Sequence, residues 1–230
     1  MKLKNLATTV LLLLLIPLAA LLGSSVFEGK HYAAVSLLVA VISCVPLFYA
    51  FQKNKTSSKE LVVLSVMIAI SVAGRFIFGW LPGFKPITAI TVISAVYLGR
   101  ESGFVVGSLS AVVSNFYFGQ GPWTPFQMFG WGVSGYLAGV LQKPLKKSKI
   151  LLCIYGFFAG ILYSLLVDVW TTVWADGDFN ISRYVATVIT SLPVMAEYAV
   201  SNIVFLLLLS NPIGEKLERI KKKYGLFIRS

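Results

Sequence analysis

Eight apolar segments fill most of this chain, separated by short polar, basic or proline-containing stretches. Most of these segments are long enough to cross a bilayer as helices, which takes about 20 residues each. Only 13% of the 230 residues are charged, whereas a soluble domain has about 25%. The sequence therefore predicts an all-α membrane protein with a single helical bundle, its segments lying at residues 6–27, 31–51, 61–80, 87–99, 102–118, 126–141, 150–174 and 184–210.

Two segments differ from an ordinary membrane span. The first follows Lys2 and Lys4 and is rich in leucine, like a secretory signal peptide, but it has no clear Ala-x-Ala cleavage site. We therefore expect a retained helix. The fourth, residues 87–99, covers roughly 20 Å at about 1.5 Å per residue, less than the ~30 Å hydrocarbon core. It should be surrounded by other helices or begin inside the preceding loop.

The basic residues are distributed unevenly over the loops. If the N-terminus is inside, all but four of the 20 lysines and arginines fall on the cytoplasmic side. Lys30, Lys85 and Arg183 fall outside, and Arg75 lies within a segment. The positive-inside rule therefore predicts that both termini are cytoplasmic. This placement also explains the net charge of +11 better than nucleic-acid binding does.

The stretch from Asn115 to Trp131 joins the fifth and sixth segments. Glycines and prolines interrupt the apolar pattern there and favour a short turn, which the topology places outside. Amide and hydroxyl side chains lie among aromatic rings in this turn: Asn115, Gln120, Thr124 and Gln127. Such groups in an aromatic surround can orient a polar organic ligand. We interpret the turn as a ligand site; the alternative is an aromatic belt at the membrane interface.

Three ionisable residues lie within the apolar segments: Arg75, Asp168 and Glu197. Charges inside a membrane are costly and mark functional sites by default. All three are predicted to lie below the turn. They could contact a ligand, or Arg75 could form an internal salt bridge with one of the two carboxylates, and the sequence leaves both open.

Catalytic and metal-binding motifs are missing from the sequence. It contains no His-Glu-x-x-His, no Gly-x-Ser-x-Gly and no phosphate-binding Gly-x-x-x-x-Gly-Lys. His31 is the only histidine, and Cys44 and Cys153 both lie in apolar segments, where thiols behave as small apolar groups. We therefore expect neither a metal site nor an enzyme, and any ATPase must come from another protein.

Residues 60–211 resemble the six-helix core of a substrate-binding S component of an energy-coupling factor (ECF) vitamin transporter. The resemblance rests on size, on six core segments with cytoplasmic ends and on a short second core segment. It also rests on Ala69-Ile-Ser-Val-Ala73 in the first core helix. This motif resembles the Ala-x-x-x-Ala sequence by which S components dock on a transmembrane coupling protein. On this resemblance, residues 1–59 are a two-helix extension with a basic linker, and residues 212–230 are a basic tail.

The run from Asn115 to Met128 is similar to S components associated with cobalamin or related corrinoids. The resemblance implies that the chain captures a vitamin at a bacterial-type cytoplasmic membrane, without a resident cofactor. It implies that the coupling protein and two ATP-binding cassette ATPases drive uptake. The residues that we expect at the vitamin are Phe84, Asn115, Gln120, Trp123, Thr124, Gln127, Trp131, Asp168 and Trp170.

Two other functions remain open at this stage. The chain could be a membrane scaffold without a small-molecule ligand, or a stand-alone carrier that uses Asp168 or Glu197 to couple an ion. An ECF subunit should co-purify with ATPases, a scaffold with other membrane subunits, and a carrier with neither.

Overall fold

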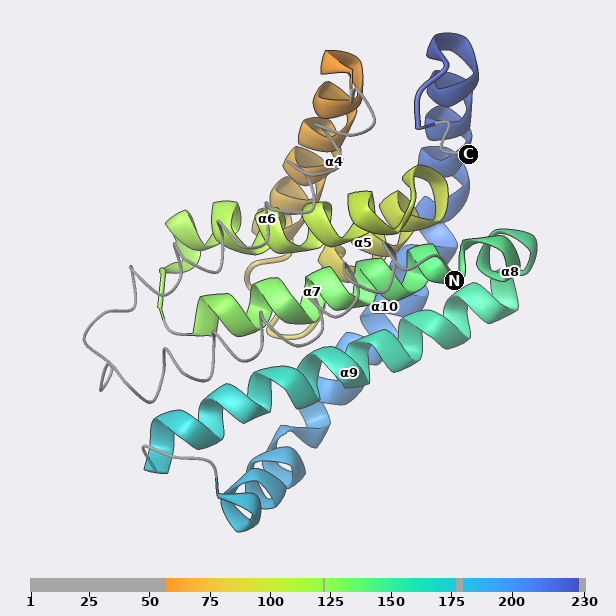
Figure 1. The fold of residues 1–230 in the computed structure, drawn as a ribbon. Coiled ribbons are helices and arrows are strands. Elements are labelled where there is room, and N and C mark those ends of the chain that lie inside the picture. The colour runs from red at the N-terminus through yellow and green to blue at the C-terminus, as the bar shows by residue number, and fades with distance from the viewer. Residues whose placement is uncertain (1–56, 122, 177–179, 228–230) are drawn as a thin grey trace, which may run out of the picture.

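The computed structural model describes residues 57–121, 123–176 and 180–227, which form seven helices and no strand (Figure 1). The first two expected segments, residues 6–27 and 31–51, lie outside the described residues. Three of the described helices are long and apolar enough to cross a membrane: α4, α9 and α10. The fold is that of an all-α membrane protein, as predicted. The helices are α4 (Ser58–Ile77), α5 (Ile87–Leu98), α6 (Arg100–Phe118), α7 (Trp123–Val140), α8 (Gln142–Lys147), α9 (Lys149–Asp176) and α10 (Ile181–Tyr224).

Helix α5 lies at the centre of the bundle, packed against α4, α6, α7 and α10. It has 12 residues, and all of them except Tyr97 are buried. A helix that is apolar on every side has to be covered on every side. The prediction of a short segment surrounded by protein is confirmed.

Helices α6 and α7 run side by side, and α9 lies along α7 (Figure 1). Glycine permits the close approach of α6 and α7, because a Cβ atom at Gly107 would lie only 2.5 Å from the carbonyl oxygen of Trp131. Small residues at such a crossing let two backbones pack directly on one another. The pair forms a rigid support for the turn that joins them.

Helix α10 differs from the prediction at its C-terminal end. We expected the segment to end at residue 210 and a basic tail to follow over residues 212–230. The structure instead has one helix of 44 residues that continues through Pro193 and Pro212. A proline removes one backbone hydrogen bond, and long packed membrane helices tolerate this loss. The end of α10 lies beside the start of α4, where the amine of Lys59 is 4.9 Å from the centre of the Tyr224 ring.

Candidate functional site

The turn between α6 and α7 places its amide side chains opposite one another. Helix α6 ends at Phe118, and Gly119 follows with a φ of 97°, a conformation that side chains other than glycine rarely adopt. Helix α7 then begins at Trp123 and returns alongside α6. The last turn of α6, with Asn115, therefore faces the first two turns of α7, with Gln127.

Asn115 is the centre of a hydrogen-bonded network at this turn. Its Nδ2 atom donates to Thr124 Oγ1 at 2.9 Å and to Gln127 Oε1 at 2.8 Å. The Thr124 hydroxyl donates to Gln120 Oε1 at 3.0 Å. Asn115 and Thr124 are fully buried. Four of the residues predicted for the site are thus brought together and hold one another in fixed orientations.

Arg75 reaches this network from α4. Its Nη1 atom donates to Asn115 Oδ1 at 2.7 Å and to the hydroxyl of Ser114. Its guanidinium carbon lies 4.6 Å from the centre of the Phe118 ring and 5.2 Å from that of Trp131, within the range of cation–π interactions. Only 6% of Arg75 is exposed. A buried cation therefore joins the amide network and the aromatic rings.

The partners of Arg75 are neutral groups. In the described part of the chain, the salt bridges are Arg100–Glu101 and Lys146–Glu218, so the internal salt bridge considered for Arg75 is not seen. Two buried donors at this place, Arg75 Nε and Trp131 Nε1, have no hydrogen-bond partner among the described residues. Unpaired buried donors are costly. Arg75 Nε and Trp131 Nε1 are therefore unsatisfied donors at the centre of the candidate site.

The two carboxylates have other partners. Asp168 Oδ2 accepts a hydrogen bond of 2.6 Å from the hydroxyl of Ser191, which links α9 to α10. Glu197 Oε2 accepts a bond of 2.9 Å from the backbone N–H of Gly83. One turn further along α10, Ser201 Oγ accepts from the N–H of Lys85 at 2.9 Å. Glu197 and Ser201 thus fasten the α4–α5 loop to α10.

The remaining predicted residues do not join the network directly. Phe84 packs with Phe205 at a ring distance of 5.0 Å, in the cluster around α5. Trp170 packs with Phe126 at 5.8 Å in a separate small cluster. Trp123 is 37% exposed at the start of α7. The structure therefore divides the predicted set into a connected group, which Arg75 joins to Trp131, and four residues outside it: Phe84, Trp123, Asp168 and Trp170.

Two tyrosines belong to the site although the sequence analysis missed them. The Tyr163 ring stacks on Trp131, with the centroids 4.8 Å apart and the planes 7° from parallel. Tyr198 contacts the Tyr163 ring edge-on at 5.1 Å. The position of each tyrosine in the middle of an apolar segment could have indicated this, because a buried hydroxyl needs a polar partner. The polar side chains of Gln127 and Tyr198 lie near the Tyr163 hydroxyl.

The small residues of α4 lie on a different surface from this site. Ala69 and Ala73 are both exposed, as is Ser65 one turn earlier. These three residues follow one another at four-residue spacing and therefore share one face of the helix. Larger apolar residues beside them, Val66 and Ile70, are exposed as well. This face of α4 is not used for packing among the described helices.

Comparison with known proteins gives one result that covers most of the chain. A family model for the S component of the ECF-type riboflavin transporter matches residues 55–219. The match includes the helices from α4 to α9 and nearly all of α10. Searches of the curated proteins and of the solved structures give no match. The family match agrees with the membrane fold and with the resemblance to S components, and we conclude that the chain belongs to the family of S components of ECF-type riboflavin transporters.

Proposed function

We propose that the protein binds its vitamin at the buried guanidinium of Arg75, between the α6–α7 turn and the Trp131–Tyr163 stack. One observation carries this proposal: Arg75 is buried, its hydrogen-bond partners Ser114 and Asn115 are neutral, and its Nε atom has no partner in the described part of the chain. A buried charge without a counter-charge is expensive. A ligand that supplies an acceptor oxygen relieves part of that cost.

Riboflavin is the vitamin that we propose first. The family to which the chain belongs carries riboflavin in its name. The flavin ring is planar and aromatic and has two carbonyl oxygens on one edge. Such a ring suits a site where aromatic side chains lie next to unpaired donors, such as Arg75 Nε and Trp131 Nε1. Cobalamin, which also carries many acceptor groups, is kept as the second candidate.

The exposed face of α4 supports a proposal for the partners. Ala69 and Ala73 lie open, and residues this small leave a shallow groove that a second helix can enter closely. We assign this groove to the transmembrane coupling protein of an ECF transporter, with two ATP-binding cassette ATPases as the motor. The chain then contributes vitamin binding and no ATP hydrolysis.

A binding experiment tests the ligand site. The full chain is purified in detergent, its bound small molecule is identified by mass spectrometry, and riboflavin is titrated while its fluorescence is followed. We expect riboflavin to bind, and Arg75→Gln to weaken it roughly 5- to 150-fold, because a lost partner of a buried group costs about 1–3 kcal/mol. Arg219→Gln, which changes an exposed arginine far along α10, is the matched control.

The outcomes separate the candidate functions. Unchanged affinity in Arg75→Gln would place the site elsewhere. Binding of cobalamin in place of riboflavin would select the second vitamin. If neither vitamin binds and no ATPase co-purifies, the function is better explained as a membrane scaffold or an ion-coupled carrier. The carrier needs a carboxylate that is free to titrate, whereas Asp168 and Glu197 both accept hydrogen bonds that hold segments of the chain together.

A further inference from the structure

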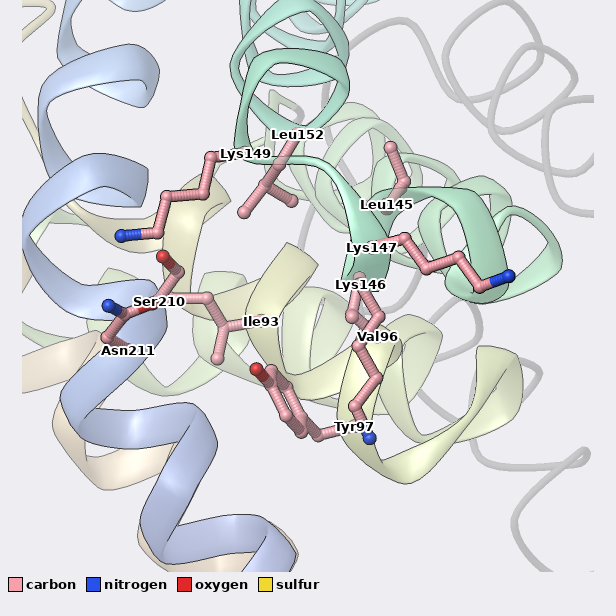
Figure 2. A pocket seen from close by; sticks show the side chains of 10 residues that line it. All are labelled: Ile93, Val96, Tyr97, Leu145, Lys146, Lys147, Lys149, Leu152, Ser210 and Asn211. Atoms are coloured by element: carbon pink, nitrogen blue, oxygen red, sulfur yellow. The ribbon is translucent and has the colours of Figure 1, made fainter.

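A cavity of 180 Å³ near the junction of α8 and α9 is separate from the vitamin site proposed above (Figure 2). Three lysines that line it, Lys146, Lys147 and Lys149, point their amines in different directions, and Lys146 pairs with Glu218 (Figure 2). These amines do not converge on one ligand. The aromatic rings around Arg75 differ from this arrangement, because they lie against one shared cation.

Two aromatic rings lie against Arg75, and they are held with unequal firmness. Trp131 is 2% exposed, lies in the middle of α7 and stacks on Tyr163 with the ring planes 7° from parallel. Phe118 is half-buried and is the last residue of α6, and the exposed Gly119 follows it. The ends of a helix open more readily than its packed middle. Phe118 is therefore the ring that can move away from the guanidinium.

Phe118 covers Arg75 near the α6–α7 turn. The centre of its ring lies 4.6 Å from the guanidinium carbon. The ring also meets the turn that follows α4, because a Cβ atom added at Gly79 would lie 3.1 Å from two of its carbons. Only 6% of Arg75 is exposed. A ligand can therefore contact the guanidinium only if a group that covers it moves.

Two exposed aromatic rings lie next to Phe118. Its ring centre is 5.4 Å from that of Phe76 and 5.2 Å from that of Tyr117. Phe76 is 43% exposed and Tyr117 is 76% exposed. Aromatic pairs and cation–π contacts have similar strengths. A rotation of Phe118 toward these two rings would therefore replace the contact that it loses with Arg75.

We propose that Phe118 is a displaceable cover of Arg75, an inference that rests on the vitamin site proposed above. Its ring turns aside toward Phe76 and Tyr117, and the aromatic ring of the ligand takes its place over the guanidinium, with Trp131 as the fixed base. Phe118 and the ligand then compete for Arg75, so the cover slows entry of the ligand and lowers its affinity. This competition selects for ligands that carry an aromatic ring.

Stopped-flow measurement of riboflavin fluorescence with the full chain in detergent tests the competition. Phe118→Ala should raise the association rate constant roughly 2- to 30-fold, the range that one cation–π contact spans, and leave the dissociation rate constant unchanged. Phe118→Leu keeps apolar bulk and should raise the association rate constant by a smaller factor. Phe116→Ala is the matched control, because Phe116 lies on the same helix turn and is 78% exposed. It should bind like the wild type.

The opposite kinetic result would overturn the proposal. If both Phe118 variants bind riboflavin with an unchanged association rate constant and a larger dissociation rate constant, Phe118 is a wall of the occupied site and not a cover. If Phe118→Ala does not fold, which a lost Tm transition would reveal, the rate constants of Phe118→Leu decide.

Chemical labelling of arginine separates this inference from the choice of vitamin. Phenylglyoxal, which modifies arginine side chains, is added to the chain without vitamin, and each modified arginine is quantified by peptide mass spectrometry. Arg75 should react faster in Phe118→Ala than in the wild type or in Phe116→Ala, whereas the exposed Arg219 should react equally in all three. If riboflavin does not bind but this difference is found, the vitamin is wrong and the cover stands. Equal labelling of Arg75 in all three would overturn the cover even if riboflavin binds.

Discussion

Replacing Asn115 by aspartate tests whether Arg75 is held ready for a ligand. The change is nearly isosteric and places a carboxylate oxygen where Asn115 Oδ1 now accepts from Arg75 Nη1 at 2.7 Å. The new carboxylate would supply the counter-charge that the buried guanidinium lacks. It would also lose the two bonds that Nδ2 donates to Thr124 and Gln127. Both partners can adjust, because a hydroxyl rotates and an amide can flip to donate.

The expected change in stability is small, because two large contributions oppose each other. Opposite charges ~4 Å apart attract by about 4 kcal/mol at an effective dielectric constant of ~20. Burying the new carboxylate costs several kcal/mol. We therefore expect Asn115→Asp to change the Tm by less than about 4 °C, given that about 1 kcal/mol shifts the Tm of a protein of this size by roughly 2–4 °C.

A second buried asparagine provides the control. Asn202 is 1% exposed, and its Nδ2 donates to the carbonyl oxygen of Gly156 at 2.9 Å. Asn202→Asp places a carboxylate against that carbonyl, with no cation supplied by the contact. An uncompensated buried charge costs about 3–5 kcal/mol, so the Tm should fall by at least about 6 °C.

Thermal unfolding in detergent and riboflavin titration measure the two consequences. Asn115→Asp should fold with nearly the wild-type Tm and bind riboflavin at least about tenfold more weakly, because the carboxylate now occupies the guanidinium. Wild-type affinity in this variant would refute the idea that the ligand needs the free charge of Arg75. A loss of stability as large as that of Asn202→Asp would show that Arg75 does not offer a favourable partner.

Three further predictions concern other parts of the molecule. Cysteines introduced by Gln120→Cys and Ser148→Cys, in a background without native cysteines, should be labelled from opposite sides of the membrane; labelling from one side would contradict the topology. Ala69→Trp/Ala73→Trp should keep riboflavin affinity in the isolated chain but lose co-purification with the coupling protein, and normal uptake would rule out the docking role. Gly107→Ala should destabilise the fold by about 1–3 kcal/mol, measured as a lower Tm, because the new methyl group meets the backbone of α7.

The grouping at the α6–α7 turn could be predicted from the sequence because the residues are close along the chain. Asn115 and Gln127 flank a turn marked by glycines and prolines, so two antiparallel helices must bring them together. The contact between Arg75 and Asn115 spans 40 positions and depends on which face of α4 meets α6. A single sequence does not show which face of α4 contacts α6. Charge alone suggested a carboxylate partner for Arg75, and the structure provides neutral partners.

Two other predictions, the end of the last apolar segment and the positions of Asp168 and Trp170, rested on single features of the sequence. The last apolar segment was predicted to end at residue 210, whereas α10 continues through Pro212 to Tyr224 despite the backbone hydrogen bond that the proline removes. Asp168 and Trp170 were placed at the ligand because they lie at a suitable depth in the membrane. The structure places Asp168 against Ser191 of α10, and it places Trp170 against Phe126 of α7, next to Gln127 in the chain.

The burial of α5 on every side has a consequence for how the protein is made. Its 12 residues are too few to be recognised and released into lipid as an independent span, which takes about 20 residues. We therefore expect α5 to be incompletely covered during synthesis until α6, α7 and α10 have been made. Chains truncated after residue 99 should therefore leave α5 exposed to quality-control proteases, whereas chains that extend through α10 should be protected.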